Sequence, residues 1–137
     1  MGRVINYDSA GKQRNQLTRA VVLAIRQISE PNQSLDLKRD LAAFISLSLE
    51  AIADTVDQSV TAWEKRGYWV KADRFRLEWL WAGLIAQKLR TAILADDWAS
   101  VDSLIPKVSQ QLSGVKVSTR HRMGQPWVGA WEKLTSG

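Results

Sequence analysis

Residues 68–94, YWVKADRFRLEWLWAGLIAQKLRTAIL, decide the fold because a helix through them would be apolar on most of its surface. At 100° per residue this segment presents two adjacent apolar faces. The first face contains Val70, Leu77, Trp81, Leu84, Ile85 and Ala92, and the second contains Phe75, Trp79, Ala82, Ala86 and Ile93. A helix of this kind is expected to be buried on more than one side. The pattern therefore predicts one long helix, over 69–95, as the most enclosed member of the fold.

Three further helices are predicted from apolar stripes bounded by turn and capping residues. They cover approximately residues 10–29, 34–66 and 98–112. Pro31 ends the first helix, Ser34 is a suitable N-cap for the second, and Gly67 suits the turn that follows it. Because the turn after the second helix is very short, this helix and the quoted segment are expected to form an antiparallel pair. Pro106 lies inside the stripe of the last helix, where we expect a kink or a break.

The end of the chain differs from these helices. Residues 115–125 lack an apolar stripe, and Pro126 is suited to start a short helical turn after them. Trp127, Trp131 and Leu134 then recur at the spacing of one helix face. We expect this arm to pack on the bundle, for instance on the second apolar face of the quoted segment, or on a partner subunit.

Together these elements predict an all-α protein, an antiparallel up-and-down four-helix bundle with an extended C-terminal arm that ends in a short helical turn. The predicted domains are a helical bundle over 1–113 and a tryptophan-containing arm over 114–137. A chain of 137 residues is long enough to bury one sufficient core.

Composition excludes several classes of function. The chain contains no cysteine, which excludes disulfides, thiolate metal sites and thiol catalysis. It shows neither the apolar run of a signal peptide nor the roughly 20 apolar residues of a membrane span. We therefore expect a cytoplasmic protein that does not bind membranes. No catalytic or cofactor-binding residues are predicted, since phosphate-loop and nucleophile-elbow motifs are absent.

Carboxylates on the second predicted helix suggest a metal site at first sight. Glu50, Asp54 and Asp57 share one face of that helix. That face lies about 130° from the centre of the apolar stripe, so the carboxylates are expected to face solvent. A small all-α enzyme with a divalent-metal site near Asp54, Asp57 and Asp73 is therefore only the third hypothesis.

The tryptophans and one lysine provide the other candidate sites. The quoted segment places Lys88 within an apolar face, which predicts an inter-helix pocket formed by Trp63, Trp81 and Lys88. Aromatic anchors are enriched at interfaces, and a small bundle has limited room for seven tryptophans. The predicted interface consists of Trp69, Trp79, Trp127 and Trp131.

Basic residues concentrate at the two ends of the chain. Residues 1–29 hold five basic side chains and one acidic one, residues 114–137 hold four and one, and the middle is slightly acidic. This asymmetry predicts anion binding by Lys12, Arg19, Arg26, Lys116, Arg120, His121 and Arg122. The leading hypothesis is a non-enzymatic helical interaction module that self-associates as a homo-oligomer or binds another protein. The alternative is binding of nucleic acid through the basic ends.

Overall fold

The computed structural model describes residues 8–136, and this part of the chain is all-helical. Its helices are α1 (Asp8–Ile28), α2 (Leu35–Lys65), α3 (Trp69–Glu78), α4 (Leu80–Leu94), α5 (Trp98–Gln111) and α6 (Ala130–Ser136). The predicted all-α class is confirmed, whereas the finer four-helix arrangement stays a prediction. Among the described residues, no helix combines the length and the hydropathy that crossing a membrane requires.

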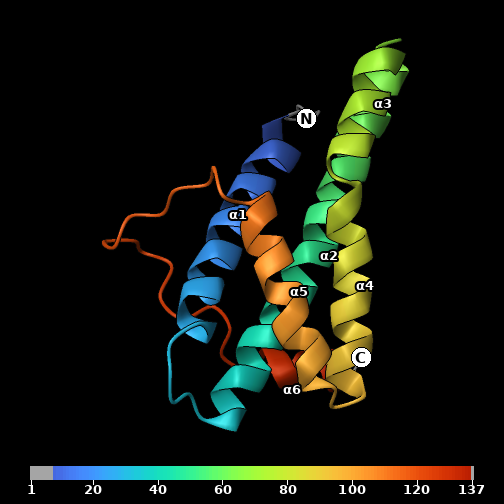
Figure 1. The fold of residues 1–137 in the computed structure, drawn as a ribbon. Helices are drawn as coiled ribbons and strands as arrows, with labels where there is room; N and C mark the ends of the chain where they lie inside the picture. The colour runs from blue at the N-terminus through green and yellow to red at the C-terminus, as the bar shows by residue number, and fades with distance from the viewer. Residues whose placement is uncertain (1–7, 137) are drawn as a thin grey trace.

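The most enclosed helix is α2. Helices α1, α3, α4 and α6 all pack directly against it, and α5 packs on α4 (Figure 1). The side chains of Leu41, Ile45, Leu49 and Ile52 are fully inaccessible to solvent. The prediction that the segment over 69–95 is the most enclosed member is therefore wrong. The long apolar stripe of α2 takes that place because neighbours cover it along its whole length.

The segment over 69–95 is also two helices rather than one. Trp79 separates α3 from α4, with φ −107° and ψ 5°. After the break, the amide of Ala82 donates to the carbonyl of Trp79, a bond across three residues instead of four. The Trp79 ring contacts Phe75 on one side of the break and stacks on Trp81 on the other, with centroids 6.3 and 5.9 Å apart. These ring contacts hold α3 and α4 in one nearly continuous column along α2 (Figure 1).

The predicted turn chemistry agrees with the structure at most helix ends. The Ser34 side chain accepts a hydrogen bond from the amide of Leu37 at the start of α2, as an N-cap does. Gly67 has φ +80°, a backbone conformation that suits glycine at the end of a helix. Helix α5 continues through Pro106, so the chain shows no break there.

The C-terminal arm packs on its own chain, but against α2 rather than on the α3–α4 column. Trp127 is only 4% exposed and belongs to the main core. The Asp40 carboxylate of α2 accepts hydrogen bonds from the amides of Gly129 and Trp131, at 3.3 and 2.9 Å. An acidic side chain at this position satisfies amides that have no partner at the start of α6. The arm therefore completes the core at one end of α2.

Candidate interaction surface

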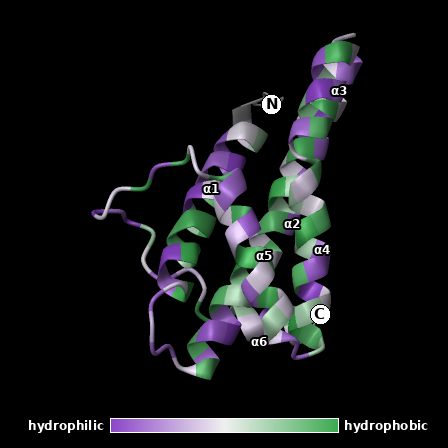
Figure 2. Ribbon diagram, viewed as in Figure 1, coloured by the Kyte–Doolittle hydropathy of each residue, from purple (hydrophilic) through white to green (hydrophobic). Residues whose placement is uncertain are grey.

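The outer face of the α3–α4 column carries large apolar side chains that no other helix covers. The exposed fractions are 66% for Val70, 71% for Leu77, 53% for Leu80, 55% for Leu84 and 54% for Leu94. Val70, Leu77 and Leu84 lie seven residues apart, and Leu80 lies between the last two, so these four share one face of the column. Figure 2 shows hydrophobic stretches alternating with hydrophilic ones along this column. We call Val70, Leu77, Leu80 and Leu84 the α3–α4 stripe.

The opposite face of the column explains why this stripe is left outside. Small side chains face α2 there, and Ala72, Ala82 and Ala86 are buried. A Cβ on Gly83 would lie 3.6 Å from the Cβ of Ala53, which shows how closely α4 approaches α2. Close approach favours the alanine face, because the bulky leucines would hold the helices apart. Sequence reasoning assigned the leucine face to the core and missed it as a surface.

Charged side chains border the stripe. Arg76 donates to Glu64 at 3.0 Å and to Asp73 at 2.7 Å, and these hydrogen bonds raise its pKa. Arg90 lies 4.0 Å from Glu50. Arg74 and Lys88, by contrast, are exposed and form no ion pair with any described residue. Two cations beside the stripe, Arg74 and Lys88, therefore have no acidic partner among the described residues.

The four tryptophans of the predicted interface lie in different environments. Trp69 is 59% exposed at the start of α3, next to Val70 of the stripe. Trp79 is partly buried in the ring cluster at the helix break. Trp127 lies in the core, and Trp131 is partly buried with the Arg39 guanidinium 5.3 Å from its ring centroid. Only Trp69 is therefore largely available to a partner.

The predicted pocket residues are not brought together as one site. Trp63 contacts Phe75 in the hairpin of α2 and α3, and Trp81 stacks on Trp79. Lys88 instead lines an open groove of about 450 Å³ between α4 and α5, and Lys107 is another of its lining residues. Neither lysine forms an ion pair within the described part of the chain.

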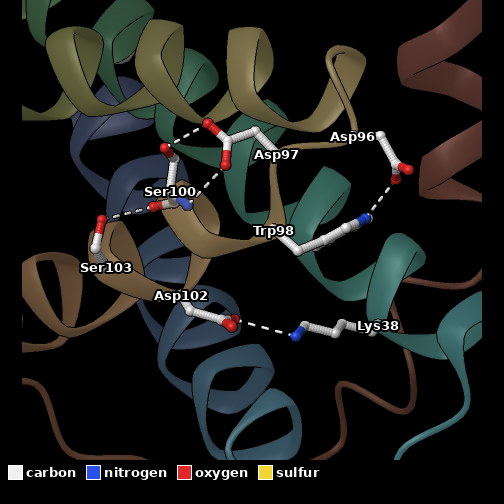
Figure 3. A network of polar contacts seen from close by, with 7 residues as sticks. All are labelled: Lys38, Asp96, Asp97, Trp98, Ser100, Asp102 and Ser103. Carbon is white, nitrogen blue, oxygen red and sulfur yellow. Dashed lines mark hydrogen bonds and ion pairs between the residues drawn. The ribbon is translucent and has the colours of Figure 1, made fainter.

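A polar network borders the same groove at the start of α5. The Asp97 carboxylate accepts hydrogen bonds from the hydroxyl and the amide of Ser100, at 2.6 and 3.2 Å (Figure 3). These two bonds lower the pKa of Asp97. Lys38 of α2 forms an ion pair with Asp102 at 3.1 Å, which ties α5 to the central helix (Figure 3). The network secures the start of α5 and engages both carboxylate oxygens of Asp97.

Arg14 makes a partly buried contact that the sequence did not indicate. Its guanidinium lies 4.7 Å from the Phe75 ring centroid and donates to the hydroxyls of Thr55 and Ser59, both at 3.3 Å. Burial lowers the pKa of Arg14, and the nearby charge of Glu78 partly offsets that effect. The side chain therefore attaches the first turns of α1 to the α2–α3 hairpin.

One contact joins the two basic ends of the chain. The Arg26 guanidinium of α1 donates to the carbonyl of Val117 at 3.0 Å, so the connection between α5 and α6 lies along α1 (Figure 1). Arg3, one of the five basic residues in the first 29, lies outside the described residues. The predicted anion-binding residues Lys12, Arg19, Arg26, Lys116, Arg120 and Arg122 are exposed, and His121 is partly buried. None of the six exposed cations forms an ion pair with a described residue.

The acidic residues do not assemble a metal site. Glu50, Asp54 and Asp57 are exposed on α2, as the helical wheel predicts. Asp73 is hydrogen-bonded to Arg76. Within residues 8–136, no group of three histidine or carboxylate side chains is arranged to hold a metal ion.

Comparison with known proteins finds no matching protein family, no matching curated protein and no matching solved structure.

Proposed function

We propose that this chain is a non-enzymatic helical interaction module that binds another protein or a second copy through the α3–α4 stripe. The observation that supports the proposal is the row of Val70, Leu77, Leu80 and Leu84, each more than half exposed. Single exposed leucines are common on protein surfaces, but a contiguous apolar patch is not. Anchors at spacings of three, four and seven residues are the pattern by which helices dock on one another.

The scaffold behind the stripe supports this proposal. Val56, Val60 and Ala72 form a small core inside the α2–α3 hairpin, and Trp63 and Phe75 pack against it. The stripe thus lies on helices fixed by their own packing, which lowers the entropy lost on binding. As part of the same proposal, α1, α2, the α3–α4 column and α5 form the predicted up-and-down bundle.

The test replaces Leu80 in the full chain with a photo-reactive residue and crosslinks the protein by light inside the cells that express it. We expect a discrete crosslinked product that disappears in the double variant Leu77→Glu/Leu84→Glu. The matched control Gln58→Glu/Thr61→Glu adds the same charge to exposed positions of α2 and is expected to retain the product. No product at Leu80, together with a monomeric mass by light scattering at all concentrations, would refute the proposal.

A second candidate function is nucleic-acid binding through the basic side of the molecule. It is favoured by the contact of Arg26 with Val117, which brings the two basic segments together. If this candidate is correct, the affinity for single-stranded nucleic acid falls steeply as salt is added. Arg120→Ala/Arg122→Ala reduces that salt dependence, whereas Leu77→Glu/Leu84→Glu leaves binding unchanged. An affinity that does not vary with salt contradicts it.

A further inference from the structure

We propose that the α3–α4 stripe binds an amphipathic helix of another protein whose own apolar stripe is bordered by acidic side chains. This inference rests on the proposed function and specifies the partner's chemistry. The row from Val70 to Leu84 covers 15 residues, and its 14 steps of ~1.5 Å rise extend about 21 Å along the column. A partner helix of about four turns therefore covers it.

The basic border of the stripe selects the sign of the partner's charge. Arg76 and Arg90 have acidic partners on the chain itself, whereas Arg74 and Lys88 have none among the described residues. Lys107 lines the same groove as Lys88, so a second lysine without an ion pair among the described residues lies on the surface beside that end of the stripe. Charges beside an apolar seam determine which helices pair. Glutamates beside the partner's leucines are therefore favoured.

The same charges disfavour two registers of a second copy. An antiparallel register that sets Val70 against Leu94 of the second copy places Arg74 beside Lys88 of that copy. It also places Arg76 beside Arg90 of the second copy, so both borders carry like charges. A parallel, in-register pair places Asp73 against its own counterpart within the seam. Like charges at such positions destabilise a helix pair.

The test is a selection from displayed helical peptides against the full chain. Each peptide has leucines fixed at heptad spacing and border positions that vary among glutamate, glutamine and lysine. We expect glutamate to be enriched, and a selected peptide to bind roughly fivefold more tightly than its glutamine-bordered version, as two exposed ion pairs would give. Arg74→Glu/Lys88→Glu should reverse the preference toward lysine, and the control Gln58→Glu/Thr61→Glu should retain it.

Four results would overturn this inference. Peptides that bind through their leucines with no border preference would leave the interaction module standing and refute the acidic partner. A dimer that Leu77→Glu/Leu84→Glu converts to a monomer would assign the stripe to a second copy. Binding to phosphatidylglycerol vesicles that the same double variant abolishes would assign it to a lipid surface. Absence of any bound peptide in a monomeric protein would contradict the interaction module as well.

Discussion

Trp127→Ala is expected to destabilise the protein strongly, because the arm is part of the core. A tryptophan buries about 150–250 Å² of surface, and ~25 cal/mol/ Å² then gives roughly 4–6 kcal/mol. Measured tryptophan-to-alanine changes in cores cost about 3–5 kcal/mol, which agrees with this figure. Since Trp127 is only 4% exposed, we expect a loss in that range in the free energy of unfolding.

Trp69→Ala is the matched control, because it removes the same side chain from an exposed position. Trp69 is 59% exposed, so the same calculation predicts a loss of at most about 2.5 kcal/mol. Urea unfolding followed by circular dichroism at 222 nm measures both variants without depending on tryptophan fluorescence. If Trp127→Ala abolishes folding, Trp127→Phe should give a smaller, measurable loss at the same site.

Two results would refute the docking of the arm on its own chain. A loss of about 1 kcal/mol or less for Trp127→Ala would mean that the arm contributes little to the core. If the difference in the free energy of unfolding between the wild type and Trp127→Ala grows as the protein concentration is raised, the arm packs on a second copy.

Three further predictions concern helix ends and packing. Asp40→Ala removes the acceptor for the amides of Gly129 and Trp131, and thermal or urea unfolding should show that the free energy of unfolding falls by about 1 kcal/mol. Asp40→Asn keeps an acceptor oxygen and should retain most of that free energy. Hydrogen bonds from Ser100 hold the pKa of Asp97 below its unfolded value, so this carboxylate stabilises the fold at neutral pH and loses that effect as the pH falls through the folded pKa. Asp97→Ala should therefore have a lower Tm than the wild type at pH 7, and this difference in Tm should become smaller below about pH 4. A Tm difference that is the same at every pH would contradict the assignment. Gly83→Ala places a Cβ at ordinary contact distance from Ala53 and should raise the free energy of unfolding by about 0.5–1 kcal/mol. If the variant is destabilised instead, α4 tolerates no added methyl group at this position.

Local signals predicted most of the helix boundaries. Ser34 and Gly67 act through neighbours a few residues away, so their roles follow from spacing alone. The αα-hairpin of α2 and α3 was also predicted from the sequence, because two helices joined by a turn as short as that at Gly67 pack antiparallel. The exposed carboxylates of α2 were likewise placed by periodicity.

The choice of buried face on the α3–α4 column did not follow from the sequence. Two apolar faces compete there, and hydropathy favours the leucine face over the alanine face. The structure buries Ala72, Ala82 and Ala86 because only small side chains allow the close approach of α4 to α2. The signal that was overlooked is Gly83 together with these alanines, which marks a close helix contact.

The amino-acid sequence by itself determined that the chain is all-helical and where most of its helices begin and end, since caps, turns and periodicity act over a few residues. Tertiary structure decided the rest: α2 as the most enclosed helix, the break at Trp79, the arm on α2, and the stripe left uncovered. Each of these four features depends on how well surfaces from distant parts of the chain fit together. That fit is set by the shapes and volumes of side chains, which a local sequence pattern does not describe.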